Sequence, residues 1–338
     1  MKKESAAFGV FLLLTLSDAI SHAQDMPEQG QPPHSQDTTQ ETPDADQAAE
    51  EIREGATSVV SIAACKAAVR PESADAALKY LKQGNARYGK GDLDGAIRQY
   101  SSAIKWDPCL ALAYSNRGNA QRRNGRFEEA IIDFNKALAI NPYLAGAFNN
   151  RGLVRRLKGE VDDAITDFSR AIELQPGYAP AYTNRGNAYR DKEDMEAAVA
   201  DFDRAIEIDP RSAPAYSNRG EARQDRGDLE GAMADYNMAV RLNPDLWQAL
   251  NNRGALRFRC GDAEGALADL DRAIAANPDY ATAYMNRGII RLLQGKKTDG
   301  QKDLDRCLRL DPRLRTLVNK RIREAKRIAD GAFGAADY

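Results

Sequence analysis

The chain has 338 residues and is close to electrically neutral, with 48 Lys and Arg against 50 Asp and Glu. It therefore lacks the overall basic excess that indicates a nucleic-acid-binding protein. Its two histidines, His22 and His34, both precede the long regular part of the sequence, which consequently offers no imidazole for acid–base catalysis or metal binding. These facts disfavour nucleic acid as a partner and most hydrolase chemistries.

The first 23 residues are typical of a secretory signal. Lys2 and Lys3 precede an almost wholly apolar run from Ala6 to Leu16, and the small-x-small sequence Ser21-His22-Ala23 follows. The run is shorter than the roughly 20 residues that a membrane span requires, so a permanent anchor is the less favoured alternative. We expect export to the periplasm or the outside, with no integral membrane segment after cleavage.

Residues 24–55 are acidic, rich in Gln and Pro, and almost free of bulky apolar side chains, so they are predicted to be a disordered linker. The chain becomes apolar again over residues 57–70. We interpret residues 56–76 as a half-repeat or N-terminal capping helix that covers the open end of the regular part. A disulfide between Cys65 and Cys109 is a further hypothesis, because both lie toward this end and an oxidising compartment would permit it.

From residue 77 a fixed pattern returns every 34 residues. Its markers are the glycines Gly84, Gly118, Gly152, Gly186, Gly220, Gly254 and Gly288. An alanine and a proline keep the same phase behind nearly every glycine, as Ala198 and Pro210 do behind Gly186. Within one period, apolar residues at helical spacing predict two helices joined by a turn, and the proline ends the second helix. One such hairpin cannot bury both of its faces, so the copies must stack.

This pattern resembles the tetratricopeptide repeat (TPR) family, in an exported bacterial form whose repeats contain Asn-Arg-Gly. The resemblance covers seven copies, at residues 77–110, 111–144, 145–178, 179–212, 213–246, 247–280 and 281–314. It implies an all-α fold, a right-handed superhelix of about seven helix hairpins with a terminal capping helix. Residues 315–330 form a basic amphipathic pattern and are interpreted as that cap, with binding to an anionic membrane as the alternative. Residues 331–338 are a tail.

Six copies carry an asparagine two positions before the marker glycine. These are Asn116, Asn150, Asn184, Asn218, Asn252 and Asn286. The resemblance places this position near the inner face of the superhelix, where stacking would align the amides in a row. An amide both donates and accepts, so the row is predicted to hold the backbone of an extended peptide. A role in starting or packing the helices is the alternative.

An arginine follows each of these asparagines, and each of the six copies also carries an aspartate in its second helix. The arginines are Arg117, Arg151, Arg185, Arg219, Arg253 and Arg287, and the aspartates are Asp133, Asp167, Asp201, Asp235, Asp269 and Asp303. The first copy has Gln83 and Gln99 at these positions. Because the two positions change together, we interpret the arginines and aspartates as structural ion pairs.

The predicted binding surface varies along the array. Arg122, Arg156 and Arg190 are expected to point inward from copies two to four. Copies six and seven instead carry an apolar patch of Phe258, Met285, Ile289, Leu292 and Leu293. This patch is covered either by the final helix or by a partner. The second alternative predicts a partner protein with an acidic segment followed by an apolar anchor.

We expect no cofactor and no metal, since the four cysteines form no Cys-x-x-Cys pair and have no histidine near them. The chain is therefore predicted to be a non-enzymatic scaffold that binds an extended peptide or a partner protein in the cell envelope. The alternative is an envelope assembly subunit that self-associates and organises cell-wall or polysaccharide machinery.

Overall fold

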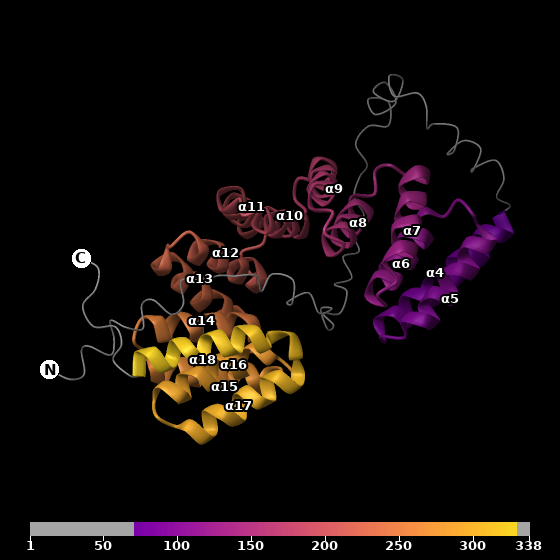
Figure 1. The fold of residues 1–338 in the computed structure, drawn as a ribbon. Coiled ribbons are helices and arrows are strands. Elements are labelled where there is room, and N and C mark those ends of the chain that lie inside the picture. Colours follow the sequence, from indigo (N-terminus) through magenta and orange to yellow (C-terminus); the bar gives the residue numbers. More distant parts are fainter. Residues whose placement is uncertain (1–70, 330–338) are drawn as a thin grey trace. The chain divides into compact units, whose positions relative to one another are not determined.

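The computed structural model describes residues 71–329, which contain fifteen α-helices, one 3-10 turn and no strand (Figure 1). The all-α fold predicted from the sequence is confirmed over this range. The predicted signal peptide (1–23), the linker (24–55) and the tail (331–338) lie outside the described residues.

The helices alternate between the first and the second helix of each repeat. The first helices are α4 (Pro71–Gly89), α6 (Ala111–Arg123), α8 (Ala145–Leu157), α10 (Ala179–Asp191), α12 (Ala213–Asp225), α14 (Trp247–Arg259) and α16 (Ala281–Leu293). The second helices are α5 (Leu93–Trp106), α7 (Phe127–Ile140), α9 (Val161–Leu174), α11 (Met195–Ile208), α13 (Leu229–Leu242), α15 (Ala263–Ala276) and α17 (Lys297–Leu310). A 3-10 turn (Pro312–Leu314) and α18 (Arg315–Ala329) follow.

Six of the seven predicted repeats begin at the residue where a first helix begins, from Ala111 to Ala281. The first repeat differs, because α4 begins at Pro71 and not at Ala77. Residues 71–76 therefore extend the first helix and do not belong to a separate half-repeat. The rest of that predicted segment, residues 56–70, lies outside the described residues.

Local chemistry explains the turn inside each hairpin. The second residue after the first helix is a glycine with positive φ in six repeats, for example Gly159 at 81°, and the fourth repeat has Glu193 at 61° instead. An aspartate next to this residue caps the second helix in several repeats, as Asp228 does by accepting a hydrogen bond of 2.9 Å from the backbone N–H of Gly231. Glycine adopts the left-handed conformation without a steric penalty, so the turn is built from local interactions alone.

The marker glycine is required by close packing between the two helices of a hairpin. A Cβ atom on Gly152 would lie 2.7 Å from Cε1 of Phe168, and Phe168 is completely buried. The small alanine of the second helix is equally buried, as Ala164 shows. Small residues at these two positions thus allow the backbones to approach while one ring fills the space beside them.

The described residues divide into two compact units. One contains α4 to α10 and ends at Lys192, and the other begins at Glu193 and contains α11 to α18. In the first unit, Leu81, Tyr100 and Ala113 share one core cluster drawn from α4, α5 and α6. In the second, the cluster around Leu250 and Leu270 joins α14, α15 and neighbouring helices. Each core therefore spans successive repeats, as a stack of hairpins requires.

The last helix closes the second unit. In α18, Val318 is buried against a cluster that includes Met285 and Ile289 of α16 and Leu304 of α17. Figure 1 shows α18 lying across α16. The predicted terminal capping helix is thus confirmed, and it differs from the predicted range only at residue 330, which lies outside the described residues.

Candidate functional site

Within each unit the first helices of successive repeats contact one another, from α4 to α10 in the first unit and from α12 to α16 in the second. We call the surface that these seven helices form, unit by unit, the first-helix face. Its inter-repeat hydrogen bonds join residues 31 or 35 positions apart, as in Asn116 with Asn85 and Asn184 with Asn149. The Asn119–Tyr88 bond, one turn further along α4 and α6, also spans 31 residues, so these neighbouring helices run parallel.

The six asparagines predicted to bind a peptide backbone are all half-buried on this face. In three of them the side-chain amide donates to an asparagine of the preceding repeat. Asn116 Nδ2 lies 3.0 Å from Asn85 Oδ1, Asn184 Nδ2 lies 2.8 Å from Asn149 Oδ1, and Asn286 Nδ2 lies 2.9 Å from Asn251 Oδ1. The asparagines thus do take part in packing between repeats. Each of these amides still has its Oδ1 and a second N–H for another partner.

The other three asparagines have different surroundings. Asn252 Nδ2 donates to Oε1 of Glu221 at 2.6 Å, and its Oδ1 accepts from Asn251 at 3.0 Å. Asn150 accepts a long hydrogen bond of 3.5 Å from Asn149. Asn218 makes no side-chain hydrogen bond to any residue between 71 and 329. The row is therefore not uniform, and Asn218 has the largest unused hydrogen-bonding capacity.

The sequence pattern did not single out Asn149 and Asn251, although both are 3% exposed and connect neighbouring repeats. In the second unit Asn251 completes a directional chain of hydrogen bonds. Asn286 donates to Asn251, Asn251 donates to Asn252, and Asn252 donates to Glu221. A signal was present in the sequence, because these are the two copies in which the position holds a second asparagine.

The three arginines predicted to form a basic stretch, Arg122, Arg156 and Arg190, are also half-buried on first helices. Arg156 is held by Asp191 of the next first helix, with Nε at 2.5 Å and Nη2 at 3.3 Å from the carboxylate oxygens. Arg122 donates two hydrogen bonds to Oδ1 of Asn119. At Arg156 the charge is thus balanced within the chain, which weakens the expectation of a basic surface there.

The predicted apolar patch is not an exposed surface. Met285 and Ile289 are buried in the cluster that α18 completes, and Leu292 packs at its edge. Phe258 is buried in the neighbouring cluster, against which Leu293 also packs. Of the two alternatives that the sequence left open, cover by the final helix is observed for Met285, Ile289 and Leu292, whereas Phe258 is buried by the neighbouring repeats. The interpretation of this patch as an anchor for a partner is corrected accordingly.

In five of the six Asn-Arg-Gly sequences the arginine forms a bidentate pair with the aspartate of its own second helix. In the third repeat Arg151 Nε and Nη2 lie 2.9 and 2.6 Å from the two oxygens of Asp167. Equivalent pairs occur in the second, fifth, sixth and seventh repeats, at Arg117, Arg219, Arg253 and Arg287. Of the remaining two residues, Arg185 belongs to the first unit and Asp201 to the second. The predicted structural pairs are thus present in both units.

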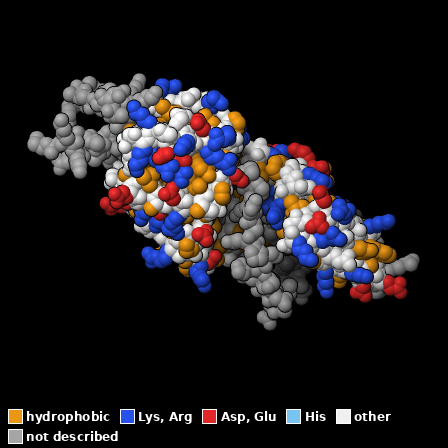
Figure 2. Space-filling view, turned by 90° about the horizontal axis from the view of Figure 1, so that it is seen from below, with side chains coloured by type: hydrophobic (Ala, Val, Ile, Leu, Met, Phe, Trp, Pro, Cys, Tyr) orange, Lys and Arg blue, Asp and Glu red, His pale blue; other side chains and the backbone are white. Residues whose placement is uncertain are grey.

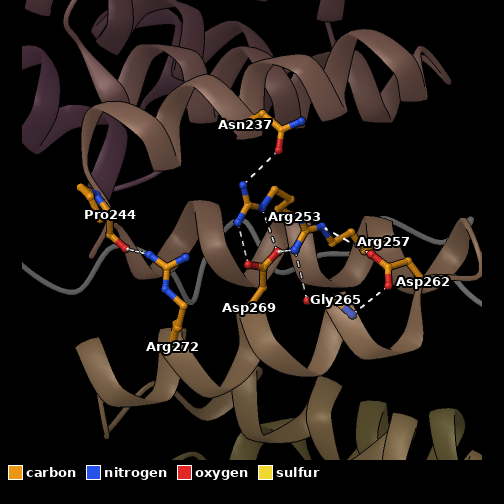
Figure 3. Close-up of polar contacts among 8 residues, drawn as sticks. All are labelled: Asn237, Pro244, Arg253, Arg257, Asp262, Gly265, Asp269 and Arg272. Atoms are coloured by element: carbon orange, nitrogen blue, oxygen red, sulfur yellow. Dashed lines mark hydrogen bonds and ion pairs between the residues drawn. The ribbon is translucent and has the colours of Figure 1, made fainter.

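The third nitrogen of the same arginines reaches the second helix of the preceding repeat. In Figure 3, Arg253 bonds Asp269 and also reaches Asn237 Oδ1 of α13 at 3.0 Å. Arg257 supplies a second cation to Asp269 at 2.9 Å. The aspartate side chain is only 2% exposed, so it is balanced by two arginines in a largely dry site. Each such arginine therefore fastens three helices together.

Electrostatics agree with this role. The hydrogen bonds that Arg117 donates to Asp133 raise the pKa of its guanidinium above the usual value. For Arg219, burial lowers the pKa, but hydrogen bonds to Asp235 and Asp203 outweigh it and the net shift is upward. These guanidinium groups are held in their charged form by the fold and are not available as proton donors. They position the first helices and do no chemistry.

No group of His, Cys, Asp and Glu between residues 71 and 329 is arranged to hold a metal ion. Over the same range, no helix combines the length and the apolar character needed to cross a membrane. On the face drawn in Figure 2, basic and acidic side chains are interspersed with hydrophobic ones.

Family models match most of the repeats. Models described as tetratricopeptide repeat match residues 111–144, 179–212 and 213–246, and one described as TPR repeat matches residues 84–125, 152–190 and 256–295. Together these stretches cover more than half of the chain. Among proteins with curated descriptions, none matches the sequence significantly.

Several solved structures are similar in fold. A tetratricopeptide repeat protein from Parabacteroides merdae ATCC 43184 has a TM-score of 0.59 and 22% identity, over 75% of this chain and 99% of that one. Pseudomonas aeruginosa pilF has a TM-score of 0.56 and 16% identity, over 67% and 100%. PilW, a type IV pilus biogenesis factor, has a TM-score of 0.55 and 20% identity, over 60% and 94%. At such identities the likeness concerns the fold alone.

Proposed function

Because the chain belongs to the tetratricopeptide repeat family, we propose that it is a non-enzymatic scaffold that binds an extended peptide or a partner protein on the first-helix face. The fold alone does not name a partner, so the proposal depends on the side chains that this face presents. The repeats account for almost every residue from 77 to 314, which leaves no separate catalytic domain in that range.

The observation that carries the proposal is the unused hydrogen-bonding capacity of the asparagine row. Asn184 and Asn286 use one N–H to reach the preceding repeat and keep Oδ1 unbonded, while Asn218 has no partner among the described residues. The inter-repeat bonds also hold the first two amides in position. Pre-ordered groups that both donate and accept can bind a peptide backbone with little loss of side-chain entropy.

We further propose that binding takes place in the cell envelope, in the periplasm or outside. The support is the signal-like sequence of residues 1–23, which lies outside the described residues.

The test uses the chain from residue 24 onward and decapeptides selected on it from a random display library. Binding of each synthesised peptide is measured by fluorescence anisotropy with Asn184→Ala, Asn218→Ala and Asn286→Ala. For peptides bound to the first unit Asn184→Ala, and for peptides bound to the second unit Asn218→Ala and Asn286→Ala, should weaken binding by roughly threefold to tenfold, the value of one hydrogen bond. The matched control is Asn319→Ala, which removes an exposed asparagine from α18 and should leave binding unchanged. A selection that yields no binding peptide, or equal binding by all variants, contradicts the proposal.

A second function, self-association, is favoured by a different observation. The large hydrophobic side chains that remain exposed among the described residues all belong to the first unit. They are Leu78, Trp106, Leu112, Ile132 and Tyr143. Ile132 is 66% exposed and Trp106 is 49% exposed, so a covering surface would remove considerable apolar area from water. A second copy of the chain could supply that surface.

Light scattering after size-exclusion chromatography separates the two functions. Self-association predicts an oligomer without any added partner, which Trp106→Ser combined with Ile132→Ser dissociates. A monomer at every concentration tested contradicts self-association and leaves peptide binding as the proposed function.

A further inference from the structure

The arginines of the first helices differ in whether they have an interaction partner. Arg259, the last residue of α14, makes no hydrogen bond, ion pair or ring contact with any described residue. The other arginines of the first helices all have a partner, whether a carboxylate, an amide, an aromatic ring or another interacting group. Arg259 is nevertheless half-buried, so it has lost part of its hydration without gaining an anion.

The neighbours of Arg259 follow from the register of the first helices. The Arg156–Asp191 pair joins residues 35 positions apart, and the same separation places Gln224 of α12 opposite Arg259. Tyr236 links them, because its hydroxyl lies 3.5 Å from Gln224 Oε1 and it interacts electrostatically with Arg259. In the third and fourth repeats the two equivalent positions hold Arg156 and Asp191, which form a complete ion pair, whereas here they hold Gln224 and Arg259. This place therefore has an arginine and an amide but no carboxylate.

More unsatisfied polar groups lie along the same two helices. The Asn252–Glu221 bond spans 31 residues, and one turn earlier the same register places Ser217 opposite Gln248. Ser217 is 2% exposed, and its Oγ has no hydrogen-bond partner. Gln248 Oε1 is likewise buried and unbonded. We call these six residues, Ser217, Glu221, Gln224, Gln248, Asn252 and Arg259, the α12–α14 seam.

Burial of Arg259 lowers the pKa of its guanidinium, and the nearby Cys260 thiol and Tyr236 hydroxyl offset that effect only in part. The direction is opposite to that of Arg117, Arg219 and Arg287, whose carboxylate partners produce a net rise in pKa. A carboxylate beside Arg259 would offset the effect of burial and raise the pKa of its guanidinium, as the aspartates do elsewhere in the array.

We propose that Arg259 binds a carboxylate of the partner, from an acidic side chain or from a C-terminus, as that partner lies along the α12–α14 seam. The inference rests on the proposed function and adds a specific anchor to it. Four of the other five seam residues carry only an uncharged hydroxyl or amide group. The seam therefore fits a largely neutral segment with a single carboxylate.

The experiment compares three decapeptide mixtures for binding to the chain from residue 24 onward. The first mixture lacks acidic residues and has an amidated C-terminus, the second adds one glutamate at a fixed central position, and the third restores only the C-terminal carboxylate. One of the two carboxylate mixtures should bind about tenfold more tightly than the neutral one. Whichever mixture gains affinity identifies the source of the carboxylate.

Arg259→Gln should abolish this preference. The matched control is Arg241→Gln, which removes an exposed arginine without a partner from α13 of the same unit and should keep the preference. No preference in the intact chain, or an equal loss in both variants, overturns the inference. If the neutral mixture still binds through the asparagines, the proposed function stands without it. If no mixture binds, the proposed function itself fails.

A stability measurement excludes a merely structural role. Because Arg259 lacks an anion, Arg259→Gln should leave the thermal midpoint unchanged or raise it. Arg156→Gln should lower the midpoint, since it takes from Asp191 the guanidinium that binds both of its carboxylate oxygens. A comparable loss of stability in the two variants would show that Arg259 supports the fold and would overturn the inference.

Discussion

Arg219 and Asp235 are joined by two hydrogen bonds of 2.9 and 2.6 Å, and the third nitrogen of Arg219 reaches Asp203 of the preceding second helix at 2.6 Å. One side chain thus connects a first helix to its own second helix and to the one before it. The same arrangement in other repeats makes the arginine of the Asn-Arg-Gly sequence a connection between repeats.

A first prediction concerns Asp235, the buried aspartate that Arg219 shares with Arg223. Asp235→Asn leaves Arg219 and Arg223 without their shared carboxylate, so the second unit should lose about 3–5 kcal/mol of stability. The first repeat has glutamines at both positions, and Arg219→Gln combined with Asp235→Gln recreates that pair. The double variant should be less destabilised than Asp235→Asn. Urea denaturation followed by circular dichroism measures both, and an equal loss would show that the charges are not coupled.

A second prediction concerns the marker glycine. Gly152→Ala places a methyl group against the buried ring of Phe168 and should cost about 1–3 kcal/mol. Gly146→Ala on the same helix has open space around its Cβ and should stabilise α8 by up to about 1 kcal/mol. Thermal denaturation of the two single variants gives the comparison. A shift of the same sign in both would mean that helix propensity, and not contact with Phe168, determines the outcome.

A third prediction concerns the turn between α10 and α11. Glu193 has φ of 61° where the six other described turns have glycine, so Glu193→Gly should relieve strain of about 1 kcal/mol. The reverse test is Gly159→Ala, at φ 81°, which should destabilise by a similar amount. Both shifts are read from thermal midpoints. An unchanged midpoint in Glu193→Gly would show that the side chain compensates for the backbone conformation.

A fourth prediction concerns the thiols. Cys109 is disulfide-bonded, while its predicted partner Cys65 lies outside the described residues; Cys260 is free and exposed, and Cys307 is free and buried. Burial, with a smaller contribution from Asp311, raises the pKa of Cys307 to about 11. In non-reducing buffer near pH 8, Ellman's reagent should modify Cys260 quickly and Cys307 only after denaturation. Cys260→Ser should remove the fast phase, and rapid reaction of both thiols in the native protein would contradict the buried position.

The same pKa sets a dependence of stability on pH. In the unfolded chain the Cys307 thiol ionises near its ordinary value of 9.0, whereas in the fold it ionises near 11. Its contribution to stability is therefore complete below about pH 9 and is lost as the pH rises toward 11. Cys307→Ala should remove this part of the alkaline loss, as urea midpoints measured across that range would show.

The helix boundaries were predictable from the 34-residue period, because the groups that set them act locally. A glycine at positive φ, an aspartate at a helix start and a proline after a helix end affect only residues a few positions away, so the starts of six repeats were placed correctly. The Arg–Asp pairs could also be predicted from the sequence, because both members lie in one hairpin and both are replaced by glutamine in the first repeat.

The contacts between repeats could not be obtained in this way. A period states which residues are equivalent, but side chains of neighbouring repeats meet at separations of 31 and 35, which depend on how one helix packs on the next. That packing pairs Arg156 with Asp191, leaves Arg259 without an anion, and covers Met285 and Ile289 with α18. These outcomes arise from contacts between distant residues, for which no local pattern in the chain gives a signal.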